Sequence, residues 1–582
     1  MIKTLLSQVK QYKLVSVLTP ICMILEVILE SFIPLVIGWL ITNGIEAKDQ
    51  SKIIYYGVIM IILAVLSLIV GALGGIFGSK ASTGFAKNLR KAMFENIQTF
   101  SFSNIDKFST ASLITRLTTD VTNLQMAYQM MLRMFTRAPF SLIVAMTMAF
   151  FVNKKIATIY LIAVLVLGTI LVLIMSRAVK YFNAVFKKYD DLNESVQENI
   201  IGMRVVKSFV REDYEKERFK KASGNIYMMF KKAENIITYN GPVMMLTVYS
   251  CMILISWLGA NYIVGGELAI GDLTTLLGYC MNILMSLMML SMIFVMVTMS
   301  YASAKRITEV LNEKSDLTNG KCPIFEVIDG SIEFKDVSFS YKEDSDESVL
   351  KNINLSINAG ETIGIIGGTG SAKTSLVNLI SRLYDVSDGE LFVGGVNVKE
   401  YDLETLRKKV AVVLQKNVLF SGTVLENLRW GNKEATKEEC IEACKLACAD
   451  GFIEKMKDGY DTFIEQGGSN VSGGQKQRLC IARALLTQPK VLILDDSTSA
   501  VDTATDARIR EAFLKKIPDT TKIIIAQRIS SIQHADRIIV MEDGEINGIG
   551  THDYLVEHND IYKDVYESQI GNTDLDVEGG AE

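Results

Sequence analysis

Six apolar stretches in the first half of the sequence constrain the fold of this chain more than any other feature. Each is long enough to cross the hydrocarbon core of a bilayer, which takes about 20 helical residues. They predict an α-helical transmembrane domain over residues 1–310, embedded in a lipid bilayer. The six transmembrane helices are expected near residues 15–42, 53–79, 136–153, 156–176, 237–264 and 272–300.

Composition excludes several other classes of protein. Hydrophobic residues make up 49% of the 582 residues, which is far from the composition of a disordered chain. The net charge is −5, so the sequence lacks the basic excess that is typical of nucleic-acid-binding proteins. We therefore expect no nucleic-acid partner.

Lys and Arg are concentrated in two long segments between the apolar stretches, residues 80–135 and 177–236. Because loops rich in Lys and Arg stay on the cytoplasmic side of a membrane, we expect both segments and both termini to be cytoplasmic. The chain would then be a multi-pass protein of the cytoplasmic membrane. The two segments also show helical periodicity, so spans two to five should continue as helices well beyond the bilayer.

Charged residues and methionines inside the spans are candidate substrate contacts. Glu26 and Glu30 lie one helical turn apart in the first span, where a carboxylate is costly unless it faces a bundle interior or water. They could meet a cationic substrate or a proton, or pair with a neighbouring Arg or Lys. Arg137, at the start of the third span, is expected to extend to the membrane interface. Six methionines at intervals of three or four residues form a stripe on the sixth span, which could line a cavity or pack against other helices. They are Met281, Met285, Met288, Met292, Met296 and Met299.

The sequence changes character after residue 330, where short strand-like runs alternate with turn residues. We expect an α/β P-loop nucleotide-binding domain at residues 330–570, joined to the membrane domain by a linker at 311–329. The acidic segment 571–582 is expected to be a disordered tail. The predicted fold class is thus a six-span helical transmembrane domain with long cytoplasmic helical extensions, followed by an α/β domain.

A phosphate-binding motif begins this second domain. Residues 367–375 follow an apolar strand-like run and precede a helix, which is the order that a phosphate-binding loop requires. Backbone N–H groups would bind anionic oxygens, Lys373 would contact the β- and γ-phosphates, and the Thr374 hydroxyl would bind Mg²⁺. Ala372 stands where the motif has its last glycine, which would weaken phosphate binding. ATP and Mg²⁺ are therefore the expected cofactors.

Two later segments extend this site. Residues 491–495 form a buried-strand run that ends in Asp495, an arrangement that places a Mg²⁺-binding carboxylate at the end of a strand. Ser472, Gly473 and Gly474 open another helix and make a second anion site. One chain needs two such sites only if the nucleotide is shared between two domains. The sequence therefore predicts a sandwich dimer.

On these motifs the chain resembles a half-transporter of the ATP-binding cassette (ABC) exporter family over nearly its whole length. The resemblance implies that Tyr341 stacks on adenine, that Gln415 couples Mg²⁺ to the membrane domain, and that residues 499–502 lie at the dimer interface. The nucleotide-binding residues that it implies are Tyr341, Gly367, Gly370, Ser371, Lys373, Thr374, Ser375, Gln415, Ser472, Gly473, Gly474 and Gln475. The implied Mg²⁺ ligands are Thr374, Gln415 and Asp495.

The cytoplasmic segments carry the same resemblance. Residues 109–120 and 198–212 are similar to the exporter loops that dock on the ATP-binding domains, and importers lack such loops. The resemblance places the coupling helices near 103–108 and 212–217. It makes Tyr214 a candidate plug for a groove on the partner's ATP-binding domain.

The chain departs from the family pattern at two catalytic positions. Asp496 replaces the Glu that polarises the attacking water, and it is one methylene shorter. A catalytic group misplaced by about 1 Å can lose about 100-fold in rate. Gln527 replaces the switch His, and Gln donates a hydrogen bond but carries no proton charge near neutral pH. The family's signature motif, here Ser472–Gln475, is intact. The face of the domain that carries the phosphate loop thus departs from the family pattern, whereas the face that carries the signature does not.

We therefore expect ATP-driven efflux across the cytoplasmic membrane by a heterodimeric exporter of the multidrug type. This chain would bind ATP at a degenerate site and give its signature to the catalytic site of a second, homologous chain. The substrate is expected to be a small amphipathic, drug-like or lipid-like molecule. Two alternatives stay open: a homodimeric exporter with two slow sites, and an ATP-binding regulatory subunit without transport.

Overall fold

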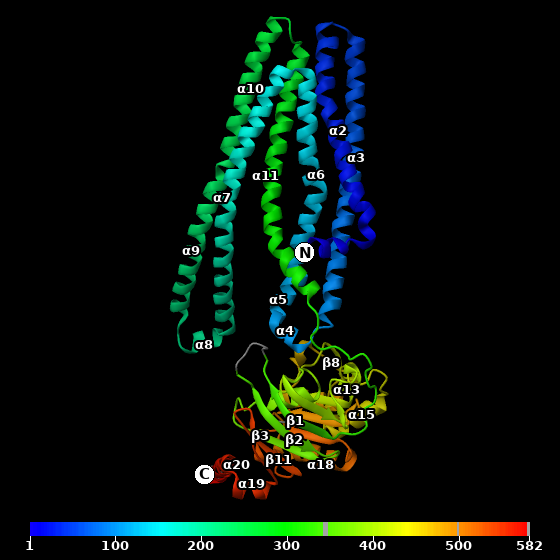
Figure 1. Cartoon of the computed structure of the whole chain (residues 1–582), viewed down its shortest axis with the longest axis vertical. Helices are drawn as coiled ribbons and strands as arrows, with labels where there is room; N and C mark the ends of the chain where they lie inside the picture. Colours follow the sequence, from blue (N-terminus) through cyan, green and yellow to red (C-terminus); the bar gives the residue numbers. More distant parts are fainter. Residues whose placement is uncertain (342–346, 498–499, 579–582) are drawn as a thin grey trace. The chain divides into compact units, whose positions relative to one another are not determined.

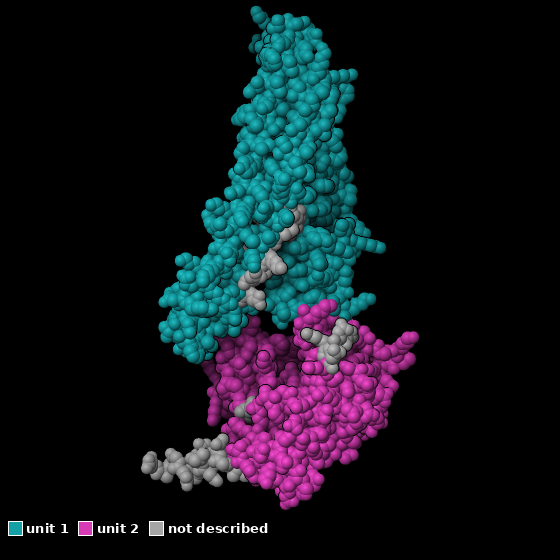
Figure 2. Space-filling view, turned by 60° about the vertical axis from the view of Figure 1, so that its left-hand side comes forward, with its two compact units in different colours: residues 1–99, 108–314 teal, residues 100–107, 315–582 magenta. Residues whose placement is uncertain are grey.

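The computed structural model of the chain describes residues 1–341, 347–497 and 500–578 (Figure 1). The chain divides into two compact units, which are coloured separately in Figure 2. The first unit consists of Met1–Thr99 and Phe108–Lys314. The second consists of Phe100–Lys107 and Ser315–Glu582.

The first unit is helical, and its longest helices carry the apolar stretches. Figure 1 shows α7 running alongside α9 and α10, which follow each other end to end, and α2 packs against α3, α6 and α11. The helices of this unit are α1 (Ile2–Ser7), η1 (Lys10–Tyr12), α2 (Lys13–Leu40), η2 (Ile41–Glu46), α3 (Gln50–Ile97), α5 (Thr110–Thr115), η3 (Arg116–Asp120), α6 (Val121–Val152), α7 (Lys154–Ile201), α8 (Met203–Ser208), α9 (Glu212–Thr238), α10 (Asn240–Val264) and α11 (Ile270–Asn312).

The predicted number of membrane spans is confirmed. Six helical segments within the described residues are long and apolar enough to cross a membrane. They are Lys10–Glu46, Gln50–Ile97, Thr110–Val152, Lys154–Ala178, Glu212–Val264 and Ile270–Phe294.

Polar side chains cap the first turns of the helices that follow two of the connections between these spans. The Asp49 carboxylate accepts hydrogen bonds from the backbone N–H groups of Ser51 and Lys52 at 3.1 and 3.3 Å, which starts α3. Asn153 is extended and separates α6 from α7, and its side chain accepts from the first N–H groups of α7. Such caps satisfy N–H groups that have no partner within the helix. Short connections of this kind keep successive helices antiparallel.

The charged segments between the spans are helical, as predicted. α3 continues to Ile97, α7 continues to Ile201, and α9 leads into α10. The expected short helix near 103–108 is α4 (Phe102–Phe108). The segment near 212–217, where the second coupling helix was expected, is the first part of the long helix α9. The short helix at this loop is α8, which follows a break at Gly202.

The expectation for Arg137 was wrong. Its guanidinium forms ion pairs with Glu26 Oε1 at 2.9 Å and Glu30 Oε2 at 2.8 Å, and so links α6 to α2. A charged group in a span is costly unless it is paired, and two carboxylates one turn apart offer a better partner than a distant interface. Gly71 of α3 makes room for this cluster, since a Cβ there would lie 2.8 Å from Glu26 Oε1.

The second unit contains most of α4 and is otherwise an α/β fold, as predicted. A six-stranded sheet has the order β12-β11-β3-β10-β9-β6, and a four-stranded sheet has the order β2-β1-β4-β5. Neighbours among β11, β3, β10, β9 and β6 are parallel, whereas β12 is antiparallel. The strands are β1 (Ile332–Phe339), β2 (Leu350–Ile357), β3 (Thr362–Gly367), β4 (Asp388–Val393), β5 (Val396–Asn397), β6 (Val410–Val413), β7 (Gly422–Thr423), β8 (Phe463–Ile464), β9 (Val491–Asp495), β10 (Thr521–Ile525), β11 (Arg537–Glu542) and β12 (Glu545–Gly550).

Helices cover the parallel sheet. They are α12 (Lys373–Ile380), α13 (Leu403–Lys409), α14 (Val424–Leu428), α15 (Lys437–Leu446), α16 (Asp450–Ile453), α17 (Gly473–Leu485), α18 (Thr503–Lys516), α19 (His552–His558) and α20 (Asp560–Glu578), with 3₁₀ turns η4 (Gly459–Asp461), η5 (Gln466–Gly468) and η6 (Ile529–Ser531). Part of the expected acidic tail is thus helix.

The parallel sheet is buried on both faces. Along β9, Val491 and Ile493 join one apolar core, whereas Leu492 and Leu494 join another on the opposite face. This alternation follows from the period of two of a strand, and strands buried on both sides need continuous apolar runs. The sheet therefore forms a rigid base for the loops that leave its edge.

Candidate nucleotide-binding site

The predicted phosphate loop, the Asp495 carboxylate and the two departing residues lie at one edge of the parallel sheet. The carboxyl ends of β3, β9 and β10 are neighbours there, because these strands run in parallel and in adjacent positions. In open α/β sheets, ligands bind at this edge. The topology therefore brings together loops that are far apart in the sequence.

The phosphate loop forms a tight turn between β3 and α12. At Gly367 a Cβ would lie 2.2 Å from the Met541 carbonyl oxygen, so only glycine fits there. Lys373 Nζ donates to the carbonyl oxygens of Gly367 and Gly368 at 2.9 and 2.7 Å, and to Ser371 Oγ at 3.0 Å. Burial lowers the pKa of Lys373, although the Asp495 and Asp496 carboxylates oppose this. The loop thus holds an ammonium group where phosphate oxygens are expected.

Ala372 adopts a backbone conformation that L-residues rarely take. Its φ is +67° and its ψ is 21°, in the left-handed region, and it is the N-cap residue of α12. Gly370, two residues before it, also has a positive φ of +89°. A glycine at 372 would take this conformation without strain, which explains why the motif has glycine there.

Thr374 and Asp495 form the predicted metal-binding pair. Thr374 Oγ1 donates to both oxygens of the Asp495 carboxylate, at 3.2 and 3.0 Å. Asp495 is 3% exposed, and its burial raises its pKa, with a further contribution from the Asp496 carboxylate. A hydroxyl and a carboxylate are hard oxygen ligands of the kind that Mg²⁺ prefers, and Mg²⁺ would hold Asp495 in its charged form. These residues therefore fit the expected ion.

Asp496, Gln527 and Gln415 meet around one carboxylate oxygen. Gln527 Nε2 donates to Asp496 Oδ2 at 2.9 Å, and Gln415 Nε2 approaches the same oxygen at 3.4 Å. The Asp496 N–H donates to the Ile525 carbonyl at 3.0 Å, which fixes the backbone against the end of β10. Asp496 and Gln527, the two residues that depart from the family pattern, thus contact each other directly.

Tyr341 lies over the start of α12. Its hydroxyl is 2.8 Å from Ser375 Oγ, and the residue is 45% exposed, so it is partly accessible to a base. The Tyr384 ring meets it edge to face at 5.2 Å between centroids. Tyr384 also donates a hydrogen bond to Asp106 of α4 at 2.9 Å. Burial, followed by the bond to Asp106, raises the pKa of Tyr384. Sequence reasoning missed this link.

The signature residues form a separate site. Ser472 caps α17 by accepting a hydrogen bond from the Gln475 N–H at 3.3 Å, and the Gln475 side chain accepts one from the Ser472 N–H at 2.9 Å. Gly474 packs closely on the next loop, since a Cβ there would lie 2.7 Å from the Ala500 carbonyl. Within the described residues, no hydrogen bond connects the signature residues to the phosphate loop. The phosphate loop and the signature are therefore two separate candidate sites.

Asp502 and Tyr214, which the resemblance singled out, are not part of this cluster. Ser499 lies outside the described residues, whereas Asp502, at the other end of the same predicted interface loop, caps α18 by accepting from the Thr505 N–H at 2.9 Å. Tyr214 lies on α9 and is 61% exposed. Its side chain is thus available for contact with another protein surface.

Comparison with known proteins identifies the family. The profile of the ABC transporter transmembrane region matches residues 17–288, and the ABC transporter profile matches residues 350–499. The uncharacterized ABC transporter ATP-binding protein YfiB of Bacillus subtilis is 37% identical over 566 residues, which cover 97% of this chain and 98% of YfiB. The uncharacterized ABC transporter ATP-binding protein Rv1273c of Mycobacterium tuberculosis is 34% identical over 576 residues, or 98% of each chain.

The fold also matches that of a solved exporter. The structure of a bacterial Atm1-family ABC exporter with ATP bound aligns with a TM-score of 0.80 at 22% identity, over 95% of this chain and 98% of that one. The chain therefore belongs to the ABC transporter family, as a half-transporter with the exporter fold in which a six-span transmembrane domain precedes an ATP-binding domain.

Proposed function

We propose that this chain is the degenerate-site subunit of a heterodimeric ABC exporter. Members of the family couple ATP hydrolysis to transport, and each ATP would lie between the phosphate loop of one chain and the signature of the other. This chain would contribute an impaired phosphate-loop side and an intact signature side. The partner would be a homologous chain with Glu and His at the positions of Asp496 and Gln527.

The observation that carries this proposal is the environment of Asp496. A general base must lie within hydrogen-bond distance of the proton that it accepts. Asp496 is one methylene shorter than Glu, and its Oδ2 already accepts a hydrogen bond from Gln527 at 2.9 Å. The carboxylate oxygen that would accept a proton from the attacking water is thus already engaged by the side chain at the switch position. Hydrolysis at this phosphate loop is therefore expected to be slow.

ATP binding does not require the missing groups. Lys373 and the backbone N–H groups of loop 367–375 would bind the phosphates, and Tyr341 would stack on adenine. Thr374, Gln415 and Asp495 would hold Mg²⁺, which neutralises phosphate charge when bound. The site would retain ATP and keep the two ATP-binding domains together while the partner's site hydrolyses.

The signature would complete the partner's catalytic site. Ser472, Gly473, Gly474 and Gln475 stand at the N-terminal end of α17, where the helix dipole and the backbone N–H groups favour an anion. In the dimer this end would contact the γ-phosphate bound by the partner. Productive hydrolysis would thus depend on this chain even though its own phosphate loop is slow.

A small amphipathic, drug-like or lipid-like substrate fits the membrane unit best. Met281, Met285, Met288 and Met292 are between 44% and 67% exposed on α11, so these four side chains are only partly used in packing within the chain. Flexible thioethers suit varied apolar molecules. We place the transmembrane domain at 1–310 and the ATP-binding domain at 330–570, with both termini cytoplasmic.

The experiment that tests this proposal is purification of the tagged chain from its native membrane under mild conditions, followed by native mass spectrometry. A second ABC half-transporter at equal stoichiometry, with Glu and His at the two positions, is the expected result. Recovery of the chain as a homodimer with full ATPase activity would contradict it. Substrate stimulation of the ATPase of the complex would distinguish an exporter from a regulatory subunit, which should give no such signal.

A further inference from the structure

The C-terminal helix α20 holds the backbone of the loop that carries Gln527. Gln569 Nε2 donates a hydrogen bond to the Gln527 carbonyl at 2.9 Å. Gln569 Oε1 accepts one from the Ile529 N–H at 2.9 Å. One planar amide thus binds both ends of the segment Gln527–Ile529, although it lies 40 and 42 residues further along the chain.

An apolar helix face places Gln569 at this loop. Tyr562 of α20 is fully buried, and Tyr566 packs against the same core. Tyr562, Tyr566 and Gln569 follow one another at intervals of four and three residues, so they share one face of the helix. The Tyr562 hydroxyl is also 2.7 Å from His552 Nδ1 of α19. The amide is therefore held by a packed helix.

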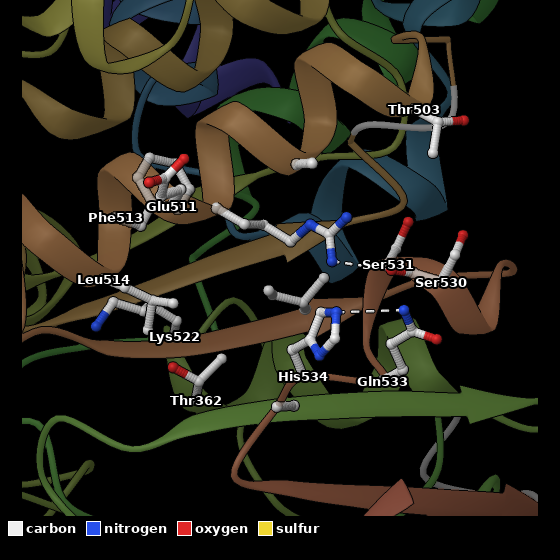
Figure 3. Close-up of a pocket in the computed structure, with 14 residues that line it drawn as sticks. Thr362, Thr503, Glu511, Phe513, Leu514, Lys522, Ser530, Ser531, Gln533 and His534 are labelled. Atoms are coloured by element: carbon white, nitrogen blue, oxygen red, sulfur yellow. Dashed lines mark hydrogen bonds between the residues drawn. The ribbon is translucent and has the colours of Figure 1, made fainter.

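The far end of the loop is bound to α18. Arg510 Nη1 donates to the Ser530 carbonyl at 2.9 Å, and Ser531 Oγ donates to Asp506 Oδ2 at 3.0 Å. Ser530, Ser531 and His534 line a cavity of about 360 Å³. Figure 3 labels these three side chains. A cavity offers no packing contacts to the loop on that side. On its other side Ile529 is 2% exposed and packs in the apolar core, so hydrogen bonds and this packing together hold the loop.

We infer that Gln569 is a positioning residue for the switch position. It holds the backbone of residues 527–529 so that the Gln527 side chain reaches Asp496, and it thereby prolongs ATP retention at this phosphate loop. The part of this inference that concerns retention rests on the proposed degenerate site. The part that concerns the loop rests on the two hydrogen bonds of the Gln569 amide.

Three variants of the full chain in the purified complex test this role. Gln569→Met keeps the length of the side chain and loses both hydrogen bonds. Gln569→Glu keeps the acceptor for the Ile529 N–H and loses the donor to the Gln527 carbonyl. Ser568→Ala is the matched control, since Ser568 is exposed and donates within α20 to the Val565 carbonyl.

The first readout is the release of azido-ATP from this chain's phosphate loop, measured by photolabelling after a chase with unlabelled ATP. Gln569→Met should shorten retention by about three- to tenfold, the scale of one net hydrogen bond, and Ser568→Ala should not change it. In a Gln527→Ala background, Gln569→Met should add no further effect, because Gln569 acts through Gln527. An equal fold-change in both backgrounds, or no change at all, would overturn the inference on retention.

The second readout is hydrogen exchange of the peptide that contains Ile529, which does not depend on ATP retention. Exchange should become faster in Gln569→Met and stay near the native rate in Gln569→Glu. If the wild-type complex does not retain ATP while Ile529 responds in this way, the proposed function fails and the positioning role stands. Unchanged exchange in Gln569→Met would overturn the positioning role itself.

Discussion

Ala372 is the residue of the phosphate loop with the most constrained backbone, at a φ of +67°. Substituting Ala372→Gly should stabilise the ATP-binding unit by about 0.5–1 kcal/mol, because the relief of left-handed strain exceeds the entropy that glycine adds to the unfolded chain. Thermal unfolding of the purified chain measures this change. Ala507→Gly, at an exposed position within α18, is the control and should destabilise by about 1 kcal/mol. Destabilisation by Ala372→Gly as well would contradict the assignment of strain.

The residue scale also shows what the sequence could and could not predict about the site. The shorter side chain of Asp496 and the uncharged Gln527 were visible as departures from a motif. Their mutual hydrogen bond was not, because it depends on how the ends of β9 and β10 lie side by side. Gln569 was missed for a similar reason, since its partners lie on a loop about 40 residues away.

The elements of the membrane unit depend on small residues where charges are buried. Gly71→Ala places a Cβ 2.8 Å from Glu26 Oε1, which is held by Arg137, whereas Gly57→Ala in the same helix meets nothing within 4 Å. Both variants gain about 1 kcal/mol in helix propensity. Gly71→Ala should still lower stability by roughly 1–3 kcal/mol relative to Gly57→Ala, because it crowds an ion pair. Melting curves in detergent compare the two, and equal melting temperatures would rule out this role of Gly71.

The ion pair between Glu361 and Arg537 joins the start of β3 to the start of β11. Arg537 donates to both oxygens of Glu361. Burial alone would raise the pKa of Glu361, but the hydrogen bonds from Arg537 and the Asn358 N–H outweigh it and hold the pKa below the ordinary 4.5. A carboxyl whose pKa is lowered by folding stabilises the protein above its unfolded pKa, and this contribution is lost as the pH falls through the folded pKa.

Glu361→Gln should therefore destabilise the ATP-binding unit at pH 7 by about 1–2 kcal/mol, the scale of a hydrogen bond to a charged group. The difference from the wild type should shrink once the pH falls below about 4. Unfolding midpoints of both proteins at a series of pH values measure this. A difference that stays constant across the series would show that charge is not the cause.

The elements were predicted best where the signal is local. A run of apolar residues or a glycine loop between a strand and a helix is determined by neighbours in sequence, so the six spans and the order of strand, loop and helix around residues 367–375 were expected correctly. Arg137 was misjudged because its partners Glu26 and Glu30 lie 111 and 107 residues away. The matching charges on the first and third spans were the signal that could have found this pair.

At the scale of the whole molecule, the two faces of the ATP-binding domain are unequal. The phosphate-loop face has Asp496 and Gln527 bound to each other, and the signature face has an intact capped helix. In a sandwich dimer these faces belong to different composite sites. A change on one face should therefore affect a different ATP from a change on the other.

The most direct test is the steady-state ATPase rate of the purified complex with one substitution on each face. Asp496→Asn removes the carboxylate at the position of the catalytic Glu, yet it should leave the rate within about twofold, because in the proposed heterodimer hydrolysis occurs at the partner's phosphate loop. Gly473→Asp places a negative charge at the anion-binding end of α17 and should lower the rate by about tenfold or more, with Gly473→Ala as its control. Loss of turnover in Asp496→Asn, or full turnover in Gly473→Asp, would contradict the account.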